Sequence, residues 1–194
     1  PQRAASVTAP APATPATVAI VDGGTGGRPA LPAQVREYFL PARAGSGALQ
    51  YRFNRGEPER TRFVSFRHGY HGDTFMTMSV CDPEEGMHQL FGAVLPRQFV
   101  LPLPSTRDLA AEFERAIAAH AHELTAVILE PLVQAAGGMK FHEPETVALI
   151  AAVARRFDLL LILDEIATGF GRTGTLLACE QAGVAPDIIT LSKA

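Results

Sequence analysis

The chain has 194 residues, of which 47% are hydrophobic and 19% are charged, and its formal net charge is −3. This balance is typical of a globular protein with one core, and it lacks the basic excess of proteins that bind nucleic acid or anionic membranes. No apolar run approaches the ~18 residues of a membrane span, and the first residues lack the pattern of a secretory signal. We therefore expect a cytoplasmic protein without nucleic-acid or membrane partners.

The cysteines and histidines give no sign of a disulfide or a metal site. Cys81 and Cys179 belong to no paired motif, so we expect two reduced thiols. The six histidines have no zinc-ligand spacing with cysteines or acids. We predict no metal ion.

Residues 1–44 differ from the rest of the chain in composition. They are rich in alanine, proline and threonine, and they lack hydrophobic periodicity. Such a segment is typical of disorder, and we assign residues 1–44 to a low-complexity segment and residues 45–194 to a folded domain. Two origins of the segment stay open: a flexible extension, or out-of-frame translation of a GC-rich gene.

The first predicted elements follow at residues 51–74. Residues 51–59 indicate the end of a helix and a turn, and alternation of apolar and polar residues predicts a strand at 62–66. The strand leads into RHGYHGDT, where a helix is expected to begin at about Asp73. Tyr70, between two glycines and just after a strand, is well placed to lie over a planar ligand, although an isolated tyrosine is more often a packing aromatic.

The middle of the chain alternates strands and helices. We predict strands at 99–103 and 126–129. A capping box at 105–108 predicts a helix that reaches about residue 122, and Pro144 begins a second helix that reaches about residue 157. This alternation predicts an α/β fold.

Two chemically active groups follow the last two predicted strands. The apolar run 159–163 has the pattern of a strand buried on both faces and ends at Asp164. A turn rich in glycine and a short helical stretch at 176–181 come next, and then a strand at 188–191 and Lys193. Because parallel strands present ligands at their carboxyl ends, Asp164 and Lys193 could face one crevice.

A carboxylate and a lysine at one crevice suit pyridoxal phosphate. This cofactor needs a lysine amine for its Schiff base and a carboxylate for its pyridine nitrogen. The chain has 17 basic residues, but only Lys140 and Lys193 are lysines, so arginine serves where charge alone is needed. On this order of groups alone, a turn-capping Asp164 and a solvated Lys193 remain an alternative.

The residues themselves favour the cofactor. The stretches DEIATGFGRTG and PDIITLSKA resemble the signature of the class III pyridoxal-phosphate-dependent aminotransferases. The resemblance implies a partial large domain of the PLP-dependent transferase fold type I, with a mostly parallel sheet and flanking helices. It also implies that Asp164 binds the pyridine nitrogen and that Lys193 is the catalytic lysine that binds the cofactor covalently.

A second stretch, GYHGDTFMTMSVCDP, narrows the resemblance to the biotin-pathway branch of that family. In this branch the amino donor is S-adenosylmethionine and the acceptor is 8-amino-7-oxononanoate, which becomes 7,8-diaminononanoate. The resemblance implies that Tyr70 stacks on the cofactor ring and that Asp73 helps to form the amino-donor site. Many other class III members have arginine at this position, so Asp73 argues against the alternative, an aminotransferase for ω-amino acids.

The resemblance carries three weaker implications. Gly45 and Ser46 match a pair at a helix N-terminus whose backbone N–H groups hold the cofactor phosphate. Glu130 lies in a segment near the cofactor, where a structural hydrogen-bonded acid and a direct role are both open. The family acts as a homodimer with active sites at the subunit interface.

The resemblance covers residues 45–194, which correspond to the central part of the large domain. The sequence stops just after Lys193. We therefore expect the chain to be a fragment that is inactive in isolation, although the parent enzyme is a transaminase.

Overall fold

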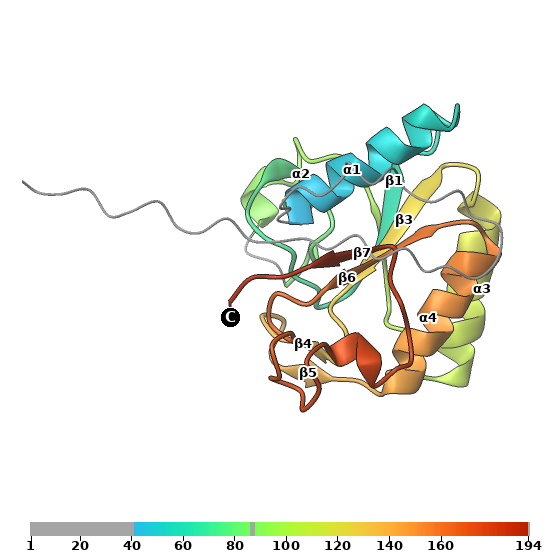
Figure 1. Cartoon of the computed structure of the whole chain (residues 1–194). Helices are drawn as coiled ribbons and strands as arrows, with labels where there is room; N and C mark the ends of the chain where they lie inside the picture. The colour runs from blue at the N-terminus through green and yellow to red at the C-terminus, as the bar shows by residue number, and fades with distance from the viewer. Residues whose placement is uncertain (1–40, 86–87, 194) are drawn as a thin grey trace, which may run out of the picture.

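The computed structural model describes residues 41–85 and 88–193 (Figure 1). The disorder predicted for residues 1–40 lies outside the described residues. No helix in the described part of the chain has both the length and the apolar character needed to cross a membrane.

A five-stranded parallel sheet occupies the centre of the molecule (Figure 1). Its strand order is β2-β1-β3-β6-β7, and every neighbouring pair is parallel. The strands are β1 (Arg62–Phe66), β2 (Phe99–Leu101), β3 (Leu124–Leu129), β6 (Leu160–Asp164) and β7 (Ile188–Thr190). The five predicted strands are confirmed, and so is the mostly parallel α/β sheet.

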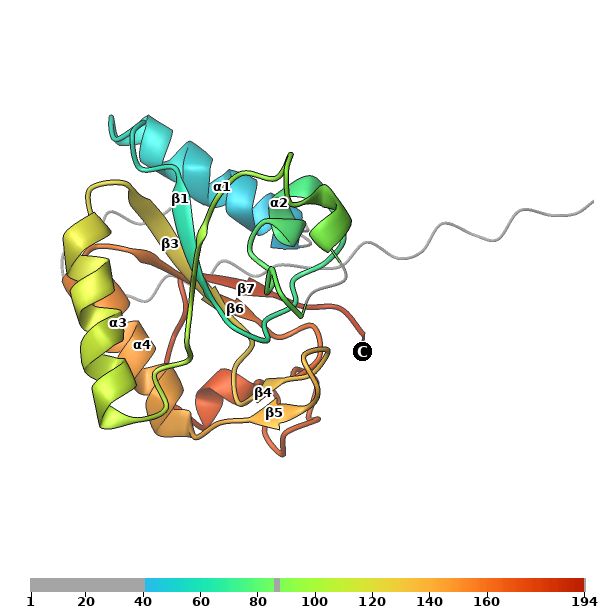
Figure 2. The same ribbon diagram turned by 180° about the vertical axis from the view of Figure 1, so that it is seen from behind.

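The two faces of the sheet carry separate apolar cores, because successive side chains of a strand point to opposite faces. Helices α3 (Arg107–His120) and α4 (Pro144–Arg156) cover one face. Helix α1 (Pro41–Asn54) covers the other, as Figures 1 and 2 show from opposite sides. Along β6, Leu161 and Leu163 pack toward α3 and α4, whereas Leu160 and Ile162 pack toward α1.

The helix starts follow from local chemistry. The Thr106 side chain accepts a hydrogen bond from the backbone N–H of Leu109 and so caps α3. The predicted capping box at 105–108 is therefore wrong by one residue, because Thr106 and not Ser105 is the cap. The proline at the first position of α4 is confirmed, and its fixed φ suits that position.

Residues 41–44 differ from the sequence prediction, because they belong to α1 rather than to a disordered segment. Ala44 and Ala48 lie one turn apart and are both buried against the sheet. Such small side chains let a helix approach a sheet closely, and this burial compensates for the two glycines in the helix.

The remaining elements are short. They are α2 (Phe75–Met78), the 3-10 turns η1 (Gln89–Phe91) and η2 (Ala178–Glu180), and a hairpin of β4 (Val133–Gln134) and β5 (Lys140–Phe141). The helical stretch predicted at 176–181 is thus a 3-10 turn. The hairpin has no counterpart among the predicted elements, since two-residue strands carry no period that a sequence can display.

Two arginines hold together the amino ends of the central strands. Arg52, at the end of α1, is 1% exposed, and its guanidinium contacts Glu57 at 2.7 Å and Asp158 at 2.9 Å. Arg60 contacts the same Asp158 carboxylate at 3.1 Å and donates to the backbone carbonyl of Leu124 at 2.7 Å. Fixed planar guanidinium groups can satisfy several acceptors at once, which explains why arginine serves here.

We expect Arg52→Met to lower the free energy of unfolding by about 2 kcal/mol, because it removes the buried donor to the Thr125 carbonyl and one of two guanidinium partners of Asp158, while keeping most of the apolar stem. Urea unfolding measures this change. The matched control is Arg55→Met, since Arg55 is a third exposed and lies 3.7 Å from Glu57. We expect the control to change stability by less than about 0.5 kcal/mol. Equal effects of the two substitutions would show that the Arg52 network does not stabilise the fold.

Candidate active site

A cavity of about 310 Å³ opens at the carboxyl ends of the sheet strands. It is lined by the segments that follow β1, β3, β6 and β7. The structure brings four of the predicted site residues to this cavity: Tyr70, Asp73, Asp164 and Lys193. The convergence of Asp164 and Lys193, expected from their places after two strands, is therefore present.

Asp164 is the last residue of β6 and is 3% exposed. Its Oδ2 lies 2.8 Å from Nδ1 of His71, and its Oδ1 accepts a hydrogen bond from the Thr190 hydroxyl at 3.0 Å. Oδ1 also accepts from the backbone N–H of Ile166 at 3.2 Å. The carboxylate thus joins β6, β7 and the loop after β1, and its position in the cavity wall is set by all three.

His71 is the residue of this site that sequence reasoning missed. Its side chain is 1% exposed, and its backbone N–H donates to Sγ of Cys81 at 3.2 Å. Because an ionised carboxylate only accepts, Nδ1 is the nitrogen that carries the proton toward Asp164. The partners are 93 residues apart in the chain, so no local signal could have paired them.

Tyr70 and Asp73 form a hydrogen-bonded pair in the wall of the cavity. The Tyr70 hydroxyl donates to Oδ1 of Asp73 at 2.9 Å. Burial, together with the neighbouring Asp73 carboxylate, raises the pKa of Tyr70 to about 12. The phenol therefore stays protonated as a donor at neutral pH. Asp73 itself is largely exposed, with 70% of its side chain accessible.

Glu130 follows β3 and acts as a brace between two loops. Its Oε1 accepts from the backbone N–H of Tyr70 at 3.1 Å, and its Oε2 accepts from that of Ala135 at 3.0 Å. Burial raises the pKa of Glu130, although His71 and the two N–H donors oppose that rise. Of the two roles that the sequence left open for Glu130, these contacts are those of a structural hydrogen-bonded acid. Glu130 also lines the cavity.

Glu165 holds the glycine-rich turn that follows Asp164. It is fully buried, and its carboxylate accepts hydrogen bonds from the Thr168 hydroxyl at 3.0 Å and from the backbone N–H groups of Ala178 and Cys179, both at 2.8 Å. Gly169 is required in this turn, because a Cβ there would lie 2.9 Å from the Glu165 carbonyl oxygen. The hydrogen bonds of the buried Glu165 carboxylate therefore hold the turn in one conformation.

Lys193 follows β7 at the rim of the cavity and is exposed. Its backbone carbonyl accepts a hydrogen bond from the Arg172 guanidinium at 2.6 Å. This contact ties the lysine backbone to the glycine-rich turn, so two segments that follow neighbouring strands meet at the Lys193 backbone.

Gly45 and Ser46 lie elsewhere, and the predicted position at a helix N-terminus is wrong. Both residues are inside α1, at least four residues from its start. From the fifth residue onward the N–H groups of a helix bond to carbonyls of the preceding turn, so they are unavailable to a phosphate. Gly45 instead packs beside Met76, where a Cβ would lie 3.2 Å from the Met76 side chain.

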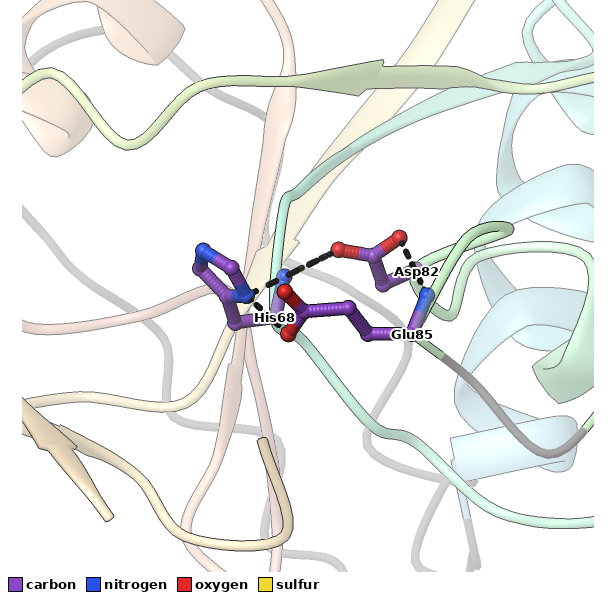
Figure 3. A group of neighbouring side chains, drawn as sticks. All are labelled: His68, Asp82 and Glu85. Atoms are coloured by element: carbon purple, nitrogen blue, oxygen red, sulfur yellow. Dashed lines mark hydrogen bonds and ion pairs between the residues drawn. The ribbon is translucent and has the colours of Figure 1, made fainter. Parts of the chain in front are cut away.

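A second polar cluster, made of His68, Asp82 and Glu85, braces the loop that carries Tyr70 (Figure 3). Nε2 of His68 lies 3.1 Å from the Lys140 ammonium, which can only donate, so Nδ1 carries the proton and donates to Glu85 at 2.5 Å. Asp82 accepts from the backbone N–H groups of His68, Glu84 and Glu85, and these contacts lower its pKa although burial opposes them. The spacing would suit a metal ion, but these donor atoms already have partners, and Lys140 and Arg67 add positive charge beside them.

Comparison with known proteins gives one family. The profile of the family described as Aminotransferase class-III matches residues 42–194. A Mycobacterium leprae protein named adenosylmethionine-8-amino-7-oxononanoate aminotransferase is 51% identical over 150 residues, covering 76% of this chain and 34% of the relative. A protein of the same name from Corynebacterium glutamicum is 47% identical over 152 residues, covering 76% of this chain and 36% of the relative. The chain thus spans about a third of the length of these curated relatives.

Solved structures agree with the sequence relatives. The adenosylmethionine-8-amino-7-oxononanoate aminotransferase of Methanocaldococcus jannaschii superposes with a TM-score of 0.74 at 35% identity, over 78% of this chain and 35% of that chain. A PLP-bound amine transaminase from an uncultivated Pseudomonas species superposes with a TM-score of 0.72 at 36% identity, over 78% of this chain and 37% of that chain. The expected partial fold type I domain is therefore confirmed.

We expect Asp73→Asn to lower the pKa of Tyr70 from about 12 toward the ordinary value of a phenol, because it removes the neighbouring negative charge. Burial remains, so the pKa should stay above about 10. A spectrophotometric titration measures it, with Tyr70→Phe to assign the signal and Asp108→Asn, on α3, as the matched control. An unchanged Tyr70 titration in Asp73→Asn would contradict the coupling.

Proposed function

Because the chain belongs to the class-III aminotransferase family, we propose that it forms the cofactor-binding part of an enzyme that transfers amino groups with pyridoxal phosphate. The observation that carries the proposal is the shared cavity of Asp164 and Lys193. Its volume of about 310 Å³ suits a small planar ring with part of a substrate.

The residues of the cavity suit the chemistry of this cofactor. Asp164 offers a buried carboxylate that His71 and Thr190 hold in one orientation, as needed by a partner for a protonated pyridine nitrogen. Lys193 offers the amine that binds the cofactor covalently. Tyr70 offers an aromatic face at the cavity wall for stacking. When bound, pyridoxal phosphate supplies the electron sink that stabilises negative charge at the substrate Cα.

The side chains of the site then have separate tasks in the reaction. When the substrate amine has displaced it from the cofactor, the freed Lys193 Nζ would take the proton from the substrate Cα as a general base. The Asp164 carboxylate would favour a positive charge on the pyridine nitrogen of the bound cofactor, and His71 keeps that carboxylate in place. Glu130 and Glu165 hold the loops, so that these groups need no rearrangement when substrate binds.

For the substrates we propose S-adenosylmethionine as amino donor and 8-amino-7-oxononanoate as acceptor, which gives 7,8-diaminononanoate in biotin synthesis. The names of the most similar relatives support this pair, and so does Asp73 at the cavity. A second candidate is transamination of another amine or of an ω-amino acid, since the amine transaminase superposes almost as well as the biotin-pathway enzyme.

We further propose a homodimer that acts in the cytoplasm, as in the family that the sequence resembles. Exposed apolar side chains support a protein partner at α2 and η1. Phe75 is 57% exposed, Leu90 is 87% exposed and Phe91 is 38% exposed, and the rings of Phe75 and Phe91 lie 6.3 Å apart. A second copy of the chain would cover this surface.

Addition of pyridoxal phosphate to the protein, followed by borohydride reduction, is expected to label Lys193. Peptide mass spectrometry locates the label. The chain offers a matched pair of variants, because its only lysines are Lys140 and Lys193. Lys193→Ala should abolish specific labelling and Lys140→Ala should leave it unchanged; a label that follows Lys140 would refute the proposed site.

Asp73→Arg in the active enzyme should lower kcat/KM for S-adenosylmethionine by more than about tenfold, because the donor then meets a cation in place of a carboxylate. Half-reaction kinetics with S-adenosylmethionine and with an ω-amino acid measure the preference. An unsubstituted enzyme that prefers the ω-amino acid would support the second candidate and exclude the first.

A further inference from the structure

His88 lies behind Tyr70 as seen from the cavity. The two rings stack with centroids 6.0 Å apart and planes inclined by 21°. Tyr70 and Asp73 line the cavity, whereas His88 does not, and His88 is only 7% exposed. His88 therefore reaches a ligand only through these two residues.

The imidazole also faces the Asp73 carboxylate. Nε2 of His88 lies 3.5 Å from Oδ1 of Asp73, the same oxygen that accepts the Tyr70 hydroxyl. This distance is at the outer limit of a hydrogen bond, and Nε2 is buried without a hydrogen-bond partner among the described residues. A buried nitrogen without a partner is costly, so a small movement of Asp73 toward His88 is favoured.

Asp73 needs such a second anchor. Its side chain is 70% exposed, and the Tyr70 hydroxyl is its one hydrogen-bond partner between side chains in the described part of the chain. One hydroxyl restrains only one direction of an exposed carboxylate, whereas a second contact at the same oxygen limits its rotation. Restricting the carboxylate before a ligand arrives reduces the entropy lost on binding.

We propose that His88 is a positioning residue for the amino-donor site, which holds the plane of the Tyr70 ring and the orientation of the Asp73 carboxylate. This inference rests on the proposed function, because only there does Asp73 belong to the donor site. It assigns two separable tasks to one imidazole: the ring supports Tyr70, and Nε2 holds Asp73.

Two substitutions separate these tasks. His88→Phe keeps a planar ring behind Tyr70 and removes Nε2, and His88→Gln places an amide near the position of Nε2 without the ring. We expect His88→Phe to lower kcat/KM for the donor half-reaction by about tenfold, because the contact between Nε2 and the charged Asp73 carboxylate is lost. We expect kcat/KM for the acceptor to stay within about twofold in His88→Phe. His88→Gln keeps an amide near Asp73 but loses the ring behind Tyr70, so it should lower kcat/KM for the donor and for the acceptor to a similar extent.

The matched control is His120→Phe on α3. His120 also contacts an aromatic ring, that of Phe99 at 4.6 Å, and lies 2.8 Å from a carboxylate, that of Glu123. It is outside the cavity lining, so we expect both half-reactions to be unchanged. Equal losses of donor and acceptor activity in His88→Phe would reduce His88 to a packing residue and overturn the proposal.

A nuclear magnetic resonance measurement tests the contact without cofactor or turnover. The ¹⁵N signal of His88 Nε2 should shift in Asp73→Asn, whereas the signals of His120 should stay. An unchanged His88 signal would overturn the inference even if the protein is an active transaminase. Failure of Lys193 to bind pyridoxal phosphate would instead refute the proposed function, while the His88 signal still reports the contact.

Discussion

The hydrogen bonds of Asp164 are the interaction on which the candidate site depends. One carboxylate joins the end of β6 to β7 through Thr190 and to the loop after β1 through His71. It can do so because parallel strands end at the same edge of the sheet. The His71 contact is a restraint that the carboxylate and the loop that carries Tyr70 share, so the site is built as one unit.

Buried acids stabilise the other loops of this edge in a similar way. Glu130 and Asp82 accept backbone N–H groups from loops, and Glu165 accepts those at the start of the 3-10 turn η2. A buried carboxylate is costly unless it is hydrogen-bonded, and buried backbone N–H groups need acceptors, so each pairing satisfies both groups. The loops around the cavity are thereby fixed without a large apolar core of their own.

The two edges of the sheet are chemically opposite. At the carboxyl edge, acids hold the loops of the cavity. At the amino edge, the guanidinium groups of Arg52 and Arg60 hold backbone carbonyls and the Asp158 carboxylate. The apolar faces between them pack against α1 on one side and against α3 and α4 on the other (Figures 1 and 2). The arginine network therefore lies at the amino ends of the strands, and the candidate site lies at their carboxyl ends.

The sequence by itself determined the strands, the α/β class and the places of Asp164 and Lys193, because apolar runs and alternation record which faces are buried. Only the tertiary structure decided which side chains hold the residues of the site in position. The pairing of His71 with Asp164 and the stacking of His88 on Tyr70 join side chains whose directions depend on loop conformation. The placement of Gly45 and Ser46 inside α1 also needed the fold, because burial of Ala44 and Ala48 against the sheet favours a helix that local propensity does not predict.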